Sequence, residues 1–206
     1  MGYPAASDAI AYCGITDTDH ASMVGDILNW AIQIVESTTG RVFAAASSDV
    51  ETKYFDAELD VDGQTLYLGS NDLLSVSNDT DGNPVIDCGG TDTVYASDVI
   101  YLPVNGTPKN AIKLRGDSGK TWTWENDPDD ALSVKGLWAY SADPPQDIWF
   151  AIMRLCKWMY DQRKTTNEID RPLLTESGNI IMPQKLPQDV MSVLLHYRKI
   201  KVGAPI

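Results

Sequence analysis

The stretch that decides the fold covers residues 134–163 and reads VKGLWAYSADPPQDIWFAIMRLCKWMYDQR. It starts as a β-like phrase that ends near Trp138, passes through Pro144 and Pro145, and continues as an apolar helix. Proline is tolerated in the first turn of a helix because the N–H that it lacks has no partner there. Asp147 suits the positive end of the helix dipole. The stretch therefore predicts a strand, a double-proline boundary and a helix that stops after residue 163.

The apolar residues of this helix are spread more widely around its axis than one packing partner requires. At 100° per residue they cover roughly 220°, whereas a surface helix usually needs an apolar stripe of only a little over 100°. A second wide arc occurs in an earlier helix, which is expected to begin near residues 17–19 and to stop at Gly40. Such arcs indicate either a subunit interface or a monomeric core packed on both sides, and we expect the interface to include Trp30, Ile34, Trp149, Met153 and Tyr160.

Two shorter helices complete the helical part of the chain. One is expected to be capped by Ser7-Asp8 and to stop at Gly14, and the other is expected to begin near Pro187. Between the first wide helix and the double proline, about eight short β-prone runs are separated by turn residues such as Asp62-Gly63, which is typical of an antiparallel sheet or small sandwich. One of these runs, TWTW at residues 121–124, alternates as an antiparallel strand would.

These elements predict an α+β protein, in which a helical bundle frame carries an inserted antiparallel β module. The helical frame is expected to comprise residues 1–43 and 144–200, and the β module residues 44–143. Residues 164–206 are expected to form a C-terminal arm with a short helix, and the polar part of this arm forms either an extended segment or a small hairpin near Ser177-Gly178.

Charge is distributed unevenly among these three parts of the chain. The net charge is −13, of which residues 1–43 contribute −4, residues 44–143 contribute −12 and residues 144–206 contribute +3. An acidic β module argues against a surface that grips phosphates. We expect no membrane-spanning helix and no secretory signal, because the sequence lacks a long apolar run and a basic, then apolar, start. Three widely spaced cysteines are expected to be reduced, without a disulfide or metal framework.

Motifs for catalysis or for cofactor and metal binding are incomplete in this sequence. The loops that contain Asp60 and Asp62, and Asp79 and Asp81, resemble the start of a calcium loop but lack its final glutamate. We therefore expect hairpin turns there and no metal site. No histidine, serine or phosphate-loop pattern has the partners that its chemistry needs. The expectation is a protein that is not an enzyme and has no cofactor.

Several phrases, in order along the chain, resemble the head–tail connector (adaptor) proteins of tailed bacteriophages. They are the Thr-Gly-Arg phrase at residues 39–41, the LYLG and DLLSV phrases at residues 66–69 and 72–76, and the V-x-G-x-W phrase from residue 134 with the PP-x-D-I phrase from residue 144. The helix that follows is similar to an A-x-x-x-L-x-x-W-x-Y-x-x-R pattern, with slightly shifted aromatic spacing, and the end phrase is similar to LP-x-x-V-x-x-L-L-x-x-Y-R. Ala139 stands where the family has glycine.

The resemblance implies a structural virion protein, located in the neck and assembled in the bacterial host cytoplasm. Such proteins form a ring, usually of twelve subunits, that joins the portal protein to a tail or stopper protein and helps to retain packaged DNA. DNA would pass through the channel of this ring without sequence-specific binding, and an acidic lining would let it slide. The basic surplus after residue 144 and the resemblance together predict a portal-binding arm that includes Tyr197, Arg198, Lys199, Ile200, Lys201 and Val202.

Two other functions fit parts of the sequence. One is a different neck or tail-completion protein or a capsid-associated β module, and the other is a carbohydrate- or surface-binding module. The binding module is suggested by Trp122, Trp124 and Trp138 near β turns. Binding modules expose aromatic residues on one platform, whereas a connector buries them, so the exposure of these tryptophans separates the two functions.

Overall fold

The computed structural model groups the chain into a helical unit and a β unit. The helical unit comprises residues 3–40 and 145–198, and the β unit comprises residues 1–2, 41–144 and 199–206. The structure describes residues 2–16, 20–45, 50–76, 86–87, 94–124, 127–164, 173–174, 180–181 and 186–199. The fold class is α+β, as the sequence predicts. That the units are separate domains stays a prediction.

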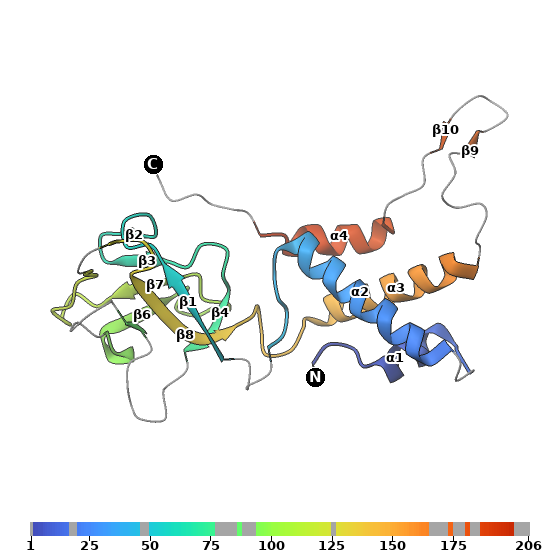
Figure 1. Ribbon diagram of the computed structural model, residues 1–206, viewed down its shortest axis with the longest axis horizontal. Coiled ribbons are helices and arrows are strands. Elements are labelled where there is room, and N and C mark those ends of the chain that lie inside the picture. Colours follow the sequence, from blue (N-terminus) through green and yellow to red (C-terminus); the bar gives the residue numbers. More distant parts are fainter. Residues whose placement is uncertain are drawn as a thin grey trace. The chain divides into compact units, whose positions relative to one another are not determined.

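The described part of the helical unit contains four helices, which are labelled in Figure 1. They are α1 (Ala6–Cys13), α2 (Ala21–Thr39), α3 (Gln146–Lys164) and α4 (Gln188–Tyr197). Helix α3 contacts each of the other three, and so does α2. A two-residue pair, β9 (Leu173–Leu174) and β10 (Ile180–Ile181), is antiparallel and brackets the position where the sequence allows a small hairpin.

The helix ends follow the local signals in the sequence. Gly14 and Gly40 take left-handed conformations, both with φ of 69°, directly after α1 and α2, and glycine adopts this conformation without a Cβ clash. The carbonyl of Pro145 accepts the first backbone hydrogen bond of α3 from Trp149, at 2.9 Å. The predicted stops at both glycines are therefore confirmed, whereas the helix expected to begin at Pro144 begins two residues later, at Gln146.

The β unit contains two antiparallel four-stranded sheets. In the first, β1 (Val50–Phe55) and β4 (Leu73–Val76) flank β8 (Leu132–Trp138), and β5 (Ile86–Asp87) also pairs with β8. The second has the order β2 (Val61–Asp62), β3 (Thr65–Tyr67), β7 (Ala111–Leu114) and β6 (Val99–Leu102). Leu73 and Lys109 exchange two backbone hydrogen bonds, of 2.9 and 2.7 Å, and thereby tie the first sheet to the segment before β7.

One hydrophobic core joins the two sheets. Strand β8 supplies Leu132, Val134 and Trp138 at alternate positions, and the second sheet supplies Leu66 and Ile112. Alternation places successive side chains on opposite faces of a strand, so three residues an even number of positions apart reach the same core. The sequence phrase that leads into the double proline is therefore the central strand of its sheet.

The turn at Asp62-Gly63 is a hairpin, as predicted. Asp62 pairs with Thr65, and Gly63 is the first of the two loop residues, with φ of 57°. Glycine at the first loop position is the pattern of a type II′ turn, whose twist matches that of the strands. Asp79 and Asp81 lie outside the described residues.

The TWTW segment is not a strand, which corrects the expectation from its alternation. Residues 121–124 have no regular secondary structure. Trp122 is nevertheless buried in the core of the β unit, and Trp124 is 39% exposed. A strand would place Trp122 and Trp124 on the same face, because they are two residues apart, whereas here only Trp122 reaches the core. Among the described helices, none is both long and apolar enough to cross a membrane.

Candidate assembly surfaces

Helix α2 carries two apolar stripes, only one of which is buried in the protomer. Val24, Leu28, Ala31 and Val35 are at most 3% exposed and form the buried stripe. A second stripe, with the same spacing, is displaced by one residue and therefore by about 100° around the helix. It consists of Met23, Ile27, Trp30 and Ile34, and we call it the Trp30 stripe.

Trp30 is the most exposed member of this stripe. Its side chain is 60% exposed, whereas Met23, Ile27 and Ile34 are half-buried. Large exposed aromatic residues at the centre of an apolar stripe are typical of interface anchors, because their burial against a partner removes much apolar area from water. The Trp30 stripe is therefore the best candidate for an assembly surface on the helical unit.

Helix α3 is different, because most of its apolar arc is buried inside the protomer. Its buried residues span about 200° of the helix, and they are Ile148, Ala151, Ile152, Met153, Leu155, Cys156 and Tyr160. Met153 is 1% exposed and Tyr160 is 4% exposed. The Tyr160 hydroxyl also hydrogen-bonds Nδ1 of His20, at 3.0 Å. The wide arc of α3 thus reflects a core packed on several sides and does not by itself require a neighbouring subunit.

The predicted interface residues therefore fall into two groups. Met153 and Tyr160 are core residues, while Trp30 is exposed and Ile34 and Trp149 are half-buried. Phe150, which the sequence analysis did not single out, is 50% exposed, and its ring meets that of Trp149 edge to face at a centroid distance of 5.3 Å. An apolar residue on the polar side of the wheel is the signal that could have identified it. The interface itself stays a prediction.

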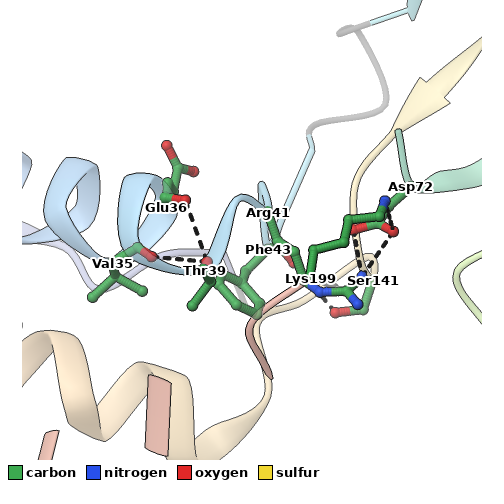
Figure 2. Close-up of polar contacts among 8 residues, drawn as sticks. All are labelled: Val35, Glu36, Thr39, Arg41, Phe43, Asp72, Ser141 and Lys199. Atoms are coloured by element: carbon green, nitrogen blue, oxygen red, sulfur yellow. Dashed lines mark hydrogen bonds and ion pairs between the residues drawn. The ribbon is translucent and has the colours of Figure 1, made fainter. Parts of the chain in front are cut away.

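The β unit contains a buried carboxylate that holds two cations (Figure 2). Asp72, whose side chain is 6% exposed, accepts hydrogen bonds from Nη1 of Arg41 at 2.7 and 2.8 Å and from Nζ of Lys199 at 2.6 Å. Arg41 also lies over the ring of Tyr140, with its guanidinium carbon 5.2 Å from the ring centroid. The cluster therefore joins the residue after Gly40, the loop before β4 and the residue that follows Arg198.

Burial in this cluster destabilises the charged form of Lys199. Burial lowers the pKa of the Lys199 ammonium, and the nearby charges of Arg41 and Lys53 act in the same direction, although Asp72 opposes them. An ion pair taken out of water gains Coulomb energy but loses hydration, and the balance is often close to zero. The geometry therefore indicates a contact that positions the chain at residue 199 more than one that stabilises the fold.

The predicted arm is in part held by contacts within the chain. The Tyr197 hydroxyl donates to both carboxylate oxygens of Asp147, at 2.9 Å each, and Lys199 is bound to Asp72. Arg198 is exposed, whereas Ile200, Lys201 and Val202 lie outside the described residues. Tyr197 and Lys199 are therefore at the base of the arm, and a portal contact by the arm stays a prediction.

The acidic loops of the β unit bind their own backbone. Oδ1 of Asp56 accepts hydrogen bonds from the N–H groups of Glu58 and Leu59, at 2.7 and 2.8 Å. The Leu59 bond is the main reason why the pKa of Asp56 is lowered. A hydrogen bond to Asp56, together with the charge of Asp127, raises the pKa of Asp129. The Asp56 carboxylate is therefore bound by the N–H groups of its own turn. That the acidic loops are independent of metal stays a prediction.

The histidines of the described part of the chain, and its candidate metal ligands, do not form a metal site. No group of three or more His, Cys, Asp or Glu residues within it could hold a metal ion. His20 faces Tyr160, and the ring of His196 packs edge to face on Tyr197 at a centroid distance of 5.3 Å. Both histidines therefore have structural partners.

The tryptophans of the β unit do not form an exposed platform. Trp122 and Trp138 are each 7% exposed, and only Trp124 is substantially accessible. The indole N–H of Trp138 donates to the carbonyl of Glu51 at 2.9 Å, which fixes the ring within its sheet. This burial argues against a carbohydrate-binding face built on the three residues.

Comparison with known proteins finds similarity only at the level of structure. No protein-family model matches the sequence, and no curated protein matches it. A chain from the neck of an empty gene transfer agent (GTA) particle, computed with C6 symmetry, aligns with a TM-score of 0.58 and 14% identity, over 97% of this chain and 91% of that chain. A chain from the virion of the native GTA particle aligns with a TM-score of 0.56 and 16% identity, over 98% and 94% of the two chains. Nearly the whole of this chain therefore shares its fold with chains of a GTA neck and virion.

Proposed function

We propose that the protein is a structural component of a virion neck, and more specifically a head–tail connector (adaptor) subunit. The observation that carries the proposal is the shared fold over almost the full length of both chains, one of which comes from a GTA neck. The connector-like phrases in the sequence support the same function independently, because they occur in order from residue 39 to residue 198.

A ring of identical subunits is the assembly that fits this function. The GTA neck was computed with C6 symmetry, and a ring of twelve subunits is compatible with a six-fold axis. Ring subunits need an apolar surface that the protomer leaves exposed, and the Trp30 stripe offers one. We propose that this stripe packs against a neighbouring copy, with Trp30 as its anchor and Ile34 and Trp149 nearby in the interface.

The remaining parts of the chain are assigned to the neighbours of the ring. We propose that residues 200–206, beyond the Lys199–Asp72 contact, reach the portal protein, and that a tail or stopper protein binds the other side. The acidic charge of residues 44–143 suits a module near the DNA channel, since it repels phosphates and leaves DNA free to slide. A different neck or tail-completion protein is the second candidate, because the same shared fold supports it.

Reconstitution with portal rings from the parent particle tests the proposal. The full chain is mixed with purified portal rings, and the complex is weighed by native mass spectrometry and viewed along its axis by electron microscopy. We expect a single added ring whose mass corresponds to twelve chains. A complex that adds one or a few copies, or none, would contradict the connector function.

A truncation and a matched point substitution test the arm. Deletion of residues 200–206 retains the Lys199–Asp72 contact, so the fold should be kept while binding to the portal is lost. Lys199→Met in the full-length chain removes the intramolecular contact but retains the segment, and it should still bind. Equal portal binding by the truncated and full-length chains would contradict the arm assignment.

A further inference from the structure

We infer that Cys13 and Cys156 form a redox-sensitive dithiol pair that can close into a disulfide between α1 and α3. Cys13 is the last residue of α1, Cys156 lies in the middle of α3, and these two helices pack against each other in the helical unit. Within that contact the two thiols hydrogen-bond each other. This pairing differs from the expectation that the three widely spaced cysteines are reduced and have no disulfide framework.

Contacts around the pair place the end of α1 against one segment of α3. Tyr12 and Cys13 act electrostatically on Lys157, and Tyr12 also acts on Arg154. Arg154 and Lys157 are three residues apart, so they share one side of α3, and Lys157 directly follows Cys156 in the chain. The end of α1 therefore lies beside the part of α3 that contains Cys156.

The two thiols differ in a way that suits sequential reaction. Cys13 is half-buried, whereas Cys156 is fully buried. The Cys13 thiol is therefore the one that a reagent in solution can reach first, and attack requires its thiolate form. Burial is the main reason why the pKa of Cys156 is raised to about 12, so this thiol is a poor attacking group at neutral pH. We therefore assign the first step to Cys13 and the closing step to Cys156.

Oxidation by a small-molecule disulfide gives a balanced reaction. The Cys13 thiolate attacks one sulfur of oxidised glutathione, forms a mixed disulfide and releases one glutathione thiolate. The Cys156 thiol loses its proton and attacks the Cys13 sulfur, which releases the second glutathione. The two cysteines together lose two protons and two electrons, and the glutathione disulfide is reduced to two thiols.

The redox state of the Cys13–Cys156 pair would depend on whether the protein is in a reducing or an oxidising environment. Disulfides are rare in the reducing cytosol but persist on virions outside the cell. If the proposed neck function is correct, the subunit assembles as a dithiol and gains a covalent link between α1 and α3 after release. The link closes a long loop, from residue 13 to residue 156, and long loops restrict the unfolded chain most.

The test uses the full-length protein, purified with reductant and then exposed to oxidised glutathione. The sequence has three cysteines, and the remaining one, Cys88, provides the matched control. We expect the wild type and Cys88→Ser to lose two free thiols and to yield a peptide that links Cys13 to Cys156 in mass spectrometry. The denaturation temperature of both should rise by about 5 °C and return to its first value with dithiothreitol.

Variants of the pair separate a specific disulfide from general oxidation. Cys13→Ser, at a half-buried position, should keep the reduced fold and show no rise in denaturation temperature with oxidant. Cys156→Ala should accumulate the mixed disulfide on Cys13. A wild type that stops at the mixed disulfide, links Cys88 instead, or shows no reaction at either cysteine would overturn the inference. Because this test needs neither portal nor ring, its failure is distinguishable from failure of the proposed function.

Discussion

Helices α2 and α3 look alike in the sequence but play different parts in the structure. Each has 19 residues, each has a wide apolar arc, and each contacts the other three helices of its unit. The buried residues of α3 extend over about 200° of the helix, whereas those of α2 occupy a stripe of about 80°. The width of an apolar arc therefore shows how much surface must be covered, but not whether the cover comes from the same chain.

The largest expected effect concerns the core of α3. Met153→Ala removes a side chain that is 1% exposed, so the substitution creates a cavity and should lower the free energy of unfolding by about 3 kcal/mol. Denaturant unfolding of the purified protein measures this change. A loss of ring assembly with no loss of protomer stability would contradict the assignment of Met153 to the core.

The complementary change on α2 should affect assembly and not folding. Trp30→Ala should weaken ring formation by about 2 kcal/mol, or roughly thirtyfold in the association constant, because a central aromatic anchor is lost. The free energy of unfolding should change by less than about 0.5 kcal/mol, as is usual for exposed sites. Gln33→Ala, at an exposed polar position on the same helix, is the control and should leave both quantities unchanged. Equal ring formation by Trp30→Ala and wild type would contradict the proposal that the Trp30 stripe packs against a neighbouring copy.

Alkaline pH provides a third way to distinguish the two helices. The thiol of Cys156 in α3 has a pKa raised to about 12, above its value in the unfolded chain. The folded state holds the thiol proton more tightly than the unfolded chain does. The stability that the protonated Cys156 thiol contributes is therefore complete below pH 8.5–9 and is lost as pH rises toward about 12. Unfolding of wild type and Cys156→Ala should be compared at pH 8 and pH 10. The decrease in stability should be smaller for the variant, and parallel decreases would contradict the burial of this thiol.

The smallest expected effect lies on the exposed side of α3. Arg154 and Asp189 form an ion pair at 2.9 Å, but both side chains are more than half exposed. Exposed pairs contribute about 0.2–1 kcal/mol, and salt screens them. A double-mutant cycle with Arg154→Met and Asp189→Asn should therefore give a coupling energy below about 1 kcal/mol that falls further in 1 M salt. A larger, salt-insensitive coupling would mean that this face of α3 is covered in solution.

The candidate sites could be predicted from the sequence only in part. Trp30 was identified because its position on a helical wheel depends on local spacing alone. Met153 and Tyr160 were placed at an interface for the same reason, but they lie in the core, since the packing of α3 against three helices cannot be read from one helix. Phe150 was missed because it lies among polar positions of the wheel. The Asp72 cluster was missed because its three residues are separated by 31 and 127 positions in the sequence.

The sequence by itself determined the order of the elements and most of their ends. The helix ends at Gly14, Gly40 and the double proline depend on backbone conformation within one turn. The alternation in β8 depends on strand geometry. These local signals do not require contacts with distant parts of the chain. Only the tertiary structure decided which apolar faces remain exposed, which carboxylate holds two cations and which cysteines meet. Those properties depend on residues brought together from distant parts of the chain, and the order of residues does not encode such distances directly.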